Sequence, residues 1–307
     1  MKLLITGAFS LNEKFKLELQ NLGFEISFHQ YEKEQVDTPQ KYDAVICNGL
    51  FLYNDIKKFT NLKLIQLTSV GYDRIDTEYC KKENIKLFNA GNAYAIPMAE
   101  WAVFQLLSVC KNSKFFIENQ SSKKWIKDRQ IKELDGKVAA IAGFGNVGKE
   151  IAKRLKAFDV KIIAVDIIEP KNAQYDKYFH IANLKEAVKE ADILVLTLPL
   201  TDETKGIISK EIFDSMKDDG ILINISRGAV INELDLINAV NSNKLYGAGL
   251  DVFCEEPLSE DNPLWNLKNF IITPHNSFVG ENNLKRLENI IYNNLSNEKD
   301  ALVNRLF

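Results

Sequence analysis

Cysteine is scarce in this chain, and the few cysteines it has are not grouped. The 307 residues include only Cys47, Cys80, Cys110 and Cys254. None of them has the paired spacing of a zinc site or a redox dithiol, which argues against a disulfide-stapled module and predicts no metal site. We expect reduced and mostly buried thiols.

The sequence also lacks long apolar runs and an excess of basic residues. The longest candidate run, residues 93–110, is interrupted by Pro97, Glu100 and Gln105, whereas a membrane helix needs ~20 apolar residues. The run Leu3 to Ile5 is too short for the core of a signal peptide. The formal net charge is -3 with both signs mixed, so no basic face is available for a nucleic acid. We therefore expect a cytoplasmic protein with no membrane or nucleic-acid partner.

The length exceeds the size at which one hydrophobic core usually stops growing, which predicts two domains. A first series of short apolar runs alternates with helical segments, among them a helix over 12–22 that ends at Gly23. This pattern predicts a parallel sheet covered on both faces. The expected strands are 2–6, 25–29, 42–47, 63–68 and 85–88.

One long helix is predicted over 96–121, with Pro97 in its first turn. Its apolar residues leave little polar face, so we expect burial at an interface between domains or between subunits. This favours a homodimer.

A second strand and helix series begins at Lys137. Helices separate most of its strands, as in a doubly wound sheet that binds its ligand beyond the carboxyl ends of the strands. A closing helix over 282–297 is predicted to return to the first domain. We thus expect one domain of residues 1–92 plus 282–307 and another of residues 93–281. The strands expected in the second domain are 138–142, 161–165, 193–197, 221–225, 246–250 and 270–273.

Gly143, Gly145 and Gly148 form a G-x-G-x-x-G pattern. The pattern is weak alone, but here a predicted strand precedes it and an amphipathic helix follows. Gly143 would allow the tight turn, Gly145 the approach of backbone amides to a pyrophosphate, and Gly148 close packing of helix on strand. The helix N-terminus would then bind the anion.

Asp166 ends the next predicted strand, roughly 20 residues after the last glycine. Its carboxylate would accept hydrogen bonds from the ribose hydroxyls and repel a 2′-phosphate, and no arginine follows it in the segment to Pro170. NAD is therefore favoured over NADP as the cofactor.

Three further segments complete a recognisable set: Ile225-Ser-Arg-Gly-Ala-Val-Ile231, Asp251-Val-Phe-Cys-Glu-Glu-Pro257 and Thr273-Pro-His-Asn276. Together with Thr68 to Asp73 and Ala95 to Glu100, they resemble the D-isomer-specific 2-hydroxyacid dehydrogenase family over essentially the whole chain. The resemblance implies an α/β protein of two doubly wound parallel-sheet domains, a flavodoxin-like substrate domain and a Rossmann NAD-binding domain.

The resemblance also implies three catalytic residues. Arg227 would bind the substrate carboxylate and polarise the adjacent carbonyl, for which a planar and permanently charged guanidinium is suited. His275 would donate the proton that the alkoxide needs after hydride transfer. Glu256 would hydrogen-bond the imidazole and favour its protonated form; Glu255 is a competitor, but the family places its acid immediately before the proline.

On the same basis, the backbone amides of Val70 and Gly71 should bind the other side of the substrate carboxylate. Asp251 is expected to accept from the nicotinamide carboxamide. The full set of positions that would contact the dinucleotide is Gly143, Gly145, Asn146, Val147, Gly148, Asp166, Leu198, Pro199, Thr204, Ile225, Ser226, Arg227, Asp251 and His275.

The predicted function is an oxidoreductase that transfers a hydride between NAD and a small 2-hydroxy or 2-oxo acid. The alternative is a non-catalytic module of the same fold that senses NAD and binds a protein partner. Such a sensor needs only the dinucleotide half, so the presence of Arg227, Glu256 and His275 together argues against it. An enzyme acting on formate is less favoured, because formate-oxidising relatives carry glutamine where this chain has Glu256.

Overall fold

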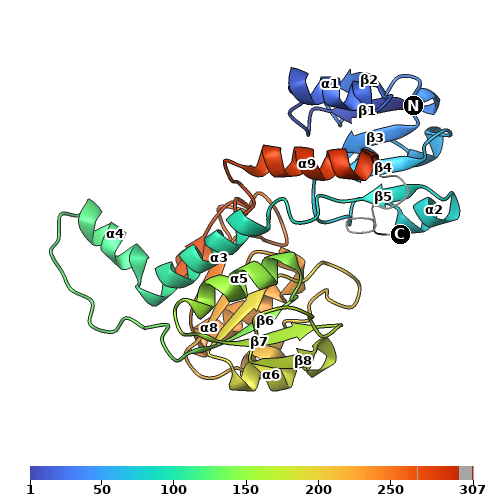
Figure 1. Ribbon diagram of the computed structural model, residues 1–307. Coiled ribbons are helices and arrows are strands. Elements are labelled where there is room, and N and C mark those ends of the chain that lie inside the picture. The colour runs from blue at the N-terminus through green and yellow to red at the C-terminus, as the bar shows by residue number, and fades with distance from the viewer. Residues whose placement is uncertain (268, 297–305, 307) are drawn as a thin grey trace. The chain divides into compact units, whose positions relative to one another are not determined.

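The computed structural model describes residues 1–267, 269–296 and 306 (Figure 1). The chain divides into two compact units, which we describe separately. Unit 1 comprises Met1–Tyr94 and Gly280–Phe307, and unit 2 comprises Ala95–Val279. These boundaries lie within a few residues of the predicted domain limits.

Unit 1 contains a parallel sheet with the strand order β2-β1-β3-β4-β5. This is the flavodoxin-like order, which reverses direction between β1 and β3. The two strands β3 and β4 are buried along their whole length, because helices or turns cover both faces of the sheet. The strands are β1 (Lys2–Thr6), β2 (Glu25–His29), β3 (Ala44–Cys47), β4 (Leu64–Leu67) and β5 (Lys86–Phe88).

Helices α1 (Glu13–Asn21) and α9 (Asn283–Ser296) cover one face of this sheet, and α2 (Thr77–Lys82) packs on the other. The predicted helix after β1 is confirmed, with Asn12 capping its first turn and Gly23 following it at a φ of +90°. Helix α9 is the predicted closing helix, and its predicted end at residue 297 lies outside the described residues. Asn294 of α9 contacts the sheet, where its Nδ2 donates to Oε1 of Gln66 in β4 at 2.7 Å.

Unit 2 contains a second parallel sheet, with the order β12-β11-β10-β9-β6-β7-β8. The strand order reverses between β9 and β6, as in a Rossmann-type sheet. A ligand is therefore expected at the carboxyl ends of these two neighbouring strands. The predicted fold class of two doubly wound parallel sheets is therefore confirmed. The strands are β6 (Val138–Ala142), β7 (Lys161–Asp166), β8 (Lys177–His180), β9 (Ile193–Leu196), β10 (Gly220–Asn224), β11 (Leu245–Leu250) and β12 (Phe270–Ile272).

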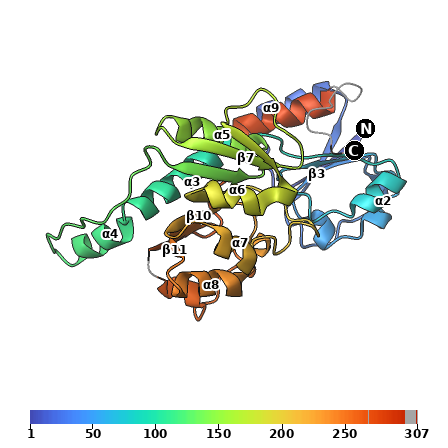
Figure 2. The same cartoon turned by 90° about the horizontal axis from the view of Figure 1, so that it is seen from below.

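The helices of unit 2 form a layer on each face of its sheet (Figures 1 and 2). Helices α3 and α5 pack on one face, and α6, α7 and α8 on the other. The bounds are α3 (Ala95–Cys110), α4 (Ser113–Ser121), α5 (Asn146–Lys156), α6 (Leu184–Glu190), α7 (Lys210–Ser215) and α8 (Glu233–Asn241). Short 3-10 turns occur in both units: η1 (Pro39–Lys41), η2 (Leu50–Leu52), η3 (Ile56–Lys58), η4 (Ile181–Asn183), η5 (Gly228–Val230) and η6 (Pro263–Asn266).

The single helix predicted over 96–121 is wrong, because the chain breaks it into α3 and α4. Asn112 adopts a left-handed conformation with a φ of +50°, which asparagine tolerates better than most residues. Helix α4 then projects beyond the sheet of unit 2 (Figure 2). Helix α3 is buried on one face only, since Ala102 and Leu106 pack on the sheet while Phe104 is 51% exposed.

Strand β8 was not predicted. It pairs only with β7 at the edge of the sheet, and its sequence, Lys-Tyr-Phe-His, has exposed residues at both ends. Edge strands of this kind lack the continuous apolar run that marks a central strand. Within the part of the chain that the structure describes, none of the helices has both the length and the apolar character required to span a bilayer.

Candidate active site

The glycine-rich turn joins β6 to α5, and two of its three glycines are required by the fold. Gly143 has a φ of +90°, and a Cβ there would lie 2.7 Å from the carbonyl carbon of Thr197. At Gly148 a Cβ would lie 2.5 Å from the carbonyl oxygen of Gly143. At Gly145, by contrast, a Cβ would meet no atom within 4 Å. The fold does not need glycine at Gly145, so the space before α5 is open to a ligand.

Helix α5 begins directly at this open space. Its first residues are Asn146, which is exposed, and Val147, which is partly buried. The first N–H groups of a helix have no partner within the helix and carry partial positive charge. The turn therefore fits the pyrophosphate of a dinucleotide.

Asp166 lies beside the turn at the end of β7. Its Oδ2 accepts the N–H of Phe144 at 2.6 Å, and its Oδ1 accepts the N–H of Ile167 at 2.7 Å. A carboxylate has about four acceptor positions, so capacity remains for further donors. The half-buried carboxylate is thus fixed in orientation with room to accept from ribose hydroxyls.

The segment after β9 lies against the same turn. Thr197 donates its hydroxyl to the carbonyl of Gly143. Leu198 is buried and Pro199 exposed, and the hydroxyl of Thr204 closes the loop by donating to the carbonyl of Pro199 at 2.6 Å. The predicted positions Leu198, Pro199 and Thr204 thus belong to one loop at the carboxyl edge of the sheet.

Arg227 is held by the residues that follow β10. Asn224 accepts from the N–H and hydroxyl of Ser226 at 3.0 and 2.8 Å, and its Nδ2 donates to the carbonyl of Arg227 at 3.0 Å. Ile225 and Ser226 are buried, whereas Arg227 is only partly buried, with Nη1 donating to the carbonyl of Ser226 at 2.8 Å. Asn224 thus fixes the main chain on both sides of the residue that carries the guanidinium.

Gly228 brings the Arg227 loop against the loop that follows β11. A Cβ at Gly228 would lie 1.9 Å from the carbonyl carbon of Phe253 and 2.3 Å from the backbone nitrogen of Cys254. No residue other than glycine fits at such an approach. The backbone next to Arg227 therefore packs directly on the segment that leads to Glu256.

Glu256 and His275 form a hydrogen-bonded pair. Oε2 of Glu256 lies 2.8 Å from Nδ1 of His275, and Oε1 accepts the N–H of Phe253 at 3.0 Å. The His275 side chain is 34% exposed, and its ring packs edge-on against Phe278. With Nδ1 bonded to the carboxylate, Nε2 is the nitrogen left for a substrate.

Asp251 has no exposed surface, and its backbone carbonyl accepts the N–H of His275. Its Oδ1 accepts the hydroxyl of Thr273 at 2.5 Å and the N–H of Asn276 at 2.9 Å, while Oδ2 accepts the N–H of Ser277 at 2.8 Å. These three bonds leave little free acceptor capacity. The expected contact between Asp251 and the nicotinamide carboxamide stays a prediction.

The candidate substrate loop of unit 1 follows β4. Three backbone carbonyls of this loop accept hydrogen bonds from side chains. The hydroxyl of Tyr94 donates to the carbonyl of Thr68 at 2.5 Å. The amide of Asn89 donates to the carbonyl of Val70 at 2.9 Å, and the hydroxyl of Ser69 to that of Gly71 at 2.8 Å. Among the described residues, no acceptor is present for the N–H groups of Val70 and Gly71. Two unpaired amides on a fixed backbone suit the binding of a carboxylate.

The other two histidines make different contacts from those of His275. His29 lies in β2 of unit 1, where its Nε2 contacts the carbonyl of Glu34. His180 ends β8 and caps a turn by accepting the N–H of Ala182 at 3.2 Å. His180 is the partner of Asp166 across β7 and β8, and the side-chain hydrogen bonds that the structure shows for both histidines are with backbone atoms, not with Glu256.

Sequence reasoning missed a group of three hydrogen-bonded residues that contacts Asp251, namely Thr273, Trp101 and Gln105. Thr273 contacts Trp101 and Gln105 of α3 through its hydroxyl. The available signal was a glutamine inside an otherwise apolar helix segment, which we treated only as an interruption of a hydrophobic run.

The parts of unit 2 make a coherent chemical site. The loops after β10, β11 and β12 all leave the carboxyl edge of one parallel sheet, where the glycine turn also lies. A guanidinium can form two parallel hydrogen bonds with one carboxylate. An imidazole paired with a carboxylate can donate or accept a proton near neutral pH. The roles of the individual residues stay predictions.

Comparisons with known proteins identify the family and the relatives of this chain. Residues 103–277 match the family model described as D-isomer specific 2-hydroxyacid dehydrogenase, NAD binding domain. The chain is 34% identical over 251 residues to a hydroxypyruvate reductase of Blautia hydrogenotrophica, covering 78% of this chain and 76% of that protein. It is 38% identical over 218 residues to a hydroxypyruvate reductase of Thermotoga maritima, covering 70% of each chain.

Solved structures share the fold over nearly the whole length. The crystal structure of the D-lactate dehydrogenase of Aquifex aeolicus, complexed with NAD and lactic acid, superposes with a TM-score of 0.79 at 26% identity. The match covers 96% of this chain and 95% of that one.

Proposed function

Because this chain belongs to the D-isomer specific 2-hydroxyacid dehydrogenase family, we propose that it transfers a hydride between NAD(H) and C2 of a small 2-hydroxy or 2-oxo acid. The observation that carries the proposal is the 2.8 Å contact between Glu256 and His275, next to the Arg227 loop. A dinucleotide-binding sheet without catalysis would need none of these three residues.

Arg227 binds the carboxylate of the substrate and polarises the neighbouring C2 carbonyl. Its guanidinium stays charged at any working pH and matches the planar geometry of a carboxylate. Val70 and Gly71 bind the same carboxylate through their backbone amides. These contacts orient the substrate so that one face of C2 meets the cofactor.

His275 supplies the proton in the direction of reduction. NADH, when bound, would supply the hydride for C2, and the carbonyl oxygen would then need a proton. His275 donates from Nε2 while Nδ1 remains bonded to Glu256, whose negative charge stabilises the protonated ring. In the direction of oxidation, neutral His275 accepts the proton of the alcohol.

The residues around the glycine turn hold the dinucleotide. Gly145 and the first amides of α5 receive the pyrophosphate, and Asp166 accepts from the ribose hydroxyls. A 2′-phosphate would lie against the Asp166 carboxylate, so like charges disfavour NADP. We therefore propose NAD as the preferred cofactor.

The test is oxidation of NADH by the purified protein, followed by its absorbance, with a panel of 2-oxo acids. Glyoxylate, hydroxypyruvate, pyruvate, phosphohydroxypyruvate and branched 2-oxo acids share the carboxylate and carbonyl that the site would bind, and differ in the rest of the molecule. Turnover of at least one of them, faster with NADH than with NADPH, is expected. If NADH binds and no acid is reduced, the site is a sensor and the proposed function is wrong.

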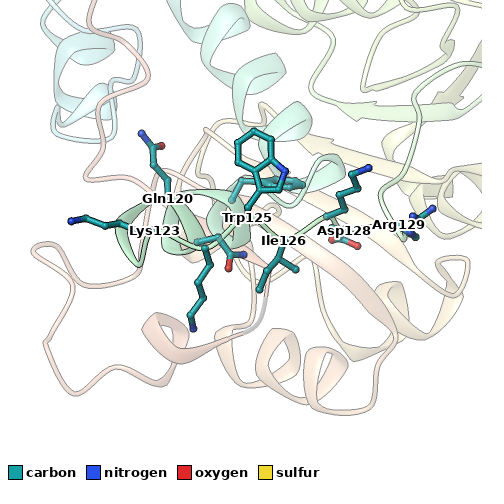
Figure 3. A pocket seen from close by; sticks show the side chains of 10 residues that line it. Gln120, Lys123, Trp125, Ile126, Asp128 and Arg129 are labelled. Atoms are coloured by element: carbon teal, nitrogen blue, oxygen red, sulfur yellow. The ribbon is translucent and has the colours of Figure 1, made fainter.

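We further propose that the working form is a homodimer that joins through α4 and the segment after it, which we call the arm (residues 113–131). The arm exposes several large apolar side chains, and Trp125 is 97% exposed (Figure 3). A surface pocket of ≈ 780 Å³ lies along the arm, lined among others by Phe116, Trp125 and Ile126. A second copy of the chain is the proposed occupant, because symmetric dimers are the commonest assemblies. Sedimentation of the wild type and of Trp125→Ser tests this, with dissociation of the variant expected.

A cytoplasmic location is proposed on the state of the thiols. All four cysteines are free, and three of them are buried inside the two units. This is typical of a reducing compartment. Fractionation of cells that express the protein would check it, and recovery outside the cytoplasm would contradict it.

A further inference from the structure

Thr273, the residue that follows β12, lies at the centre of a partly buried polar network in unit 2. Its hydroxyl donates to Oδ1 of Asp251 at 2.5 Å. It accepts from Nε1 of Trp101 at 3.2 Å and from Nε2 of Gln105 at 3.0 Å. A hydroxyl has one hydrogen and two lone pairs, so this group is fully used.

Asp251 extends the network to the turn that carries His275. The carboxylate is completely buried and accepts the N–H groups of Asn276 and Ser277. Its own carbonyl accepts the N–H of His275 at 2.8 Å. Three consecutive amides, those of His275, Asn276 and Ser277, are therefore bound to this one residue.

The backbone at His275 needs such support. Its φ is +51°, which places a side chain with a Cβ in the left-handed region that favours glycine. A residue in that region keeps its conformation only when its surroundings hold it there, and such residues cluster at functional sites. The bonds to Asp251 are the surroundings that hold the His275 ring toward Glu256.

Gln105 contributes to the network although it leaves one of its own atoms unpaired. It has no exposed surface, and its Oε1 has no hydrogen-bond partner within the described residues. Turning the amide over would face Oε1 toward Thr273, whose only hydrogen is already donated to Asp251. The amide orientation is thus set by Thr273. A buried unpaired oxygen destabilises the fold. We infer that this cost is offset by the bond that Nε2 of Gln105 donates to Thr273.

Close packing leaves the network little freedom. Helix α3 approaches β11 so closely that a Cβ at Gly249 would lie 2.7 Å from the Cβ of Gln105. Trp101 and Gln105 are four residues apart in α3 and therefore lie on one face of the helix. Both donors reach Thr273 from a rigid element rather than from a loop.

We propose that Thr273 is a positioning residue for His275, fixed by Trp101 and Gln105 of α3 and acting through the buried carboxylate of Asp251. The inference rests on the proposed function, because positioning matters only if His275 moves a proton. Thr273 itself touches neither substrate nor cofactor in this scheme. Its hydroxyl instead determines where the turn at 275–277 lies.

The primary test compares Thr273→Val, which keeps the shape and removes the hydroxyl, with Thr273→Ser, which keeps the hydroxyl. We expect Thr273→Val to lower kcat for 2-oxo acid reduction by roughly 10- to 100-fold, since small misplacements of a catalytic group cost this much. The Kd of NADH should stay within about threefold of wild type, because the glycine turn is untouched. Thr273→Ser should recover most of kcat. Equal loss of kcat in both variants, or wild-type kcat in Thr273→Val, would overturn the proposal.

Thr6→Val is the matched control. Thr6 is a buried threonine at the end of a parallel strand, whereas Thr273 is partly buried; the Thr6 hydroxyl likewise donates to a carboxylate oxygen, Oε1 of Glu32, at 2.7 Å. The partner of its hydroxyl is Glu32 and not a residue of the Thr273 network. A fall in melting temperature without a comparable fall in kcat is expected. If Thr6→Val lowers kcat as strongly as Thr273→Val, the effect is one of stability and the proposal is wrong.

Gln105→Met separates positioning from stability should Thr273→Val fail to fold. Methionine removes the Nε2 donor and also the unpaired oxygen, so the variant should be at least as stable as wild type. A positioning role predicts that kcat nevertheless falls several-fold. A stable Gln105→Met protein with wild-type kcat would count against the network.

A spectroscopic readout distinguishes this inference from the proposed function. The chain has only three histidines, so the NMR signals of ¹³C-labelled imidazole can be assigned by the loss of one signal in His275→Gln. Thr273→Val should broaden or double the His275 signal, and Thr273→Ser should not. If the wild type reduces no 2-oxo acid, the proposed function fails, yet this signal still reports whether Thr273 positions the ring. An unchanged His275 signal in Thr273→Val overturns the inference.

Discussion

Nδ1 of His275 lies 2.8 Å from Oε2 of Glu256, and the other oxygen of the same carboxylate accepts the N–H of Phe253. The glutamate therefore joins the loop after β11 to the turn after β12. Because Gly228 packs on Phe253, the Arg227 loop is part of the same cluster. A substitution of Glu256 or His275 should affect proton transfer before it affects the binding of NADH.

Replacement of His275 by glutamine should remove the proton donor and leave the proposed dinucleotide contacts of the glycine turn and Asp166 unchanged. We expect kcat for reduction to fall by roughly 10²- to 10⁴-fold, the usual contribution of a positioned acid or base, with the Kd of NADH within about threefold. Steady-state kinetics and NADH fluorescence titration measure the two. His180→Gln, at an exposed position in β8, is the control and should retain wild-type turnover. Turnover of His275→Gln at the wild-type rate would exclude His275 from the mechanism.

Gly145 gives a prediction about the cofactor that is independent of catalysis. Gly145→Ala adds a methyl group where no protein atom lies within 4 Å, so the melting temperature should not change. The same methyl group would occupy the space into which a pyrophosphate fits, and the Kd of NADH should rise roughly tenfold or more. Scanning calorimetry measures the melting temperature, and fluorescence titration measures the Kd of NADH.

Gly148→Ala is the contrasting variant. Its Cβ would lie 2.5 Å from the Gly143 carbonyl oxygen, so we expect it to destabilise the fold by several kcal/mol. If Gly145→Ala binds NADH as tightly as wild type, the turn does not hold the dinucleotide and the site assignment fails.

The sequence allowed the central strands and the glycine turn to be predicted because their signals are local. Buried strands such as β3 and β9 are continuous apolar runs. The positive φ of Gly143 and the approach of Gly148 to the Gly143 carbonyl are both features of the turn itself. The edge strand β8 escaped prediction because only one neighbour buries it. The end of α3 was not predicted, because the residues on both sides of Asn112 are compatible with a helix and only the left-handed conformation of Asn112 interrupts it.

The network behind His275 could not be predicted from sequence. Thr273 meets Gln105 across a separation of 168 residues, and that contact exists only after α3 has packed on the sheet. Nothing in the local sequence of either residue encodes it. The identity of Glu256 rather than Glu255 as the partner of His275 was likewise taken from a family resemblance, and the 2.8 Å contact now provides a structural reason for it.

The choice between NAD and NADP should depend on the charge of Asp166. Asp166→Asn keeps an oxygen that can accept the N–H of Phe144, so the turn should persist. The variant no longer repels a 2′-phosphate, and we expect the ratio of kcat/KM for NADH over NADPH to fall by about 10- to 100-fold, since like charges in contact cost several kcal/mol. Glu169→Gln removes a nearby exposed charge and should leave the ratio within about twofold. The same ratio in Asp166→Asn and wild type would show that another residue selects the cofactor.

The four thiols should differ widely in reactivity. Burial raises the pKa of Cys80 to about 11 and that of Cys110 to about 11, and it raises the pKa of Cys47 well above its usual value. Partial burial, and then the charge of Glu233, raise the pKa of Cys254 too, but Cys254 is exposed. A higher pKa means less thiolate at any given pH, so at pH 8 only Cys254 combines a usable thiolate fraction with access for a reagent. In the native protein, a disulfide reagent should therefore label one thiol per chain quickly and the remainder at least about 100-fold more slowly. Cys254→Ser should abolish the fast phase, and denaturant should release all of the remaining thiols. A fast phase that persists in Cys254→Ser would mean that one of the two units opens locally in the native state and exposes a thiol that the folded chain buries.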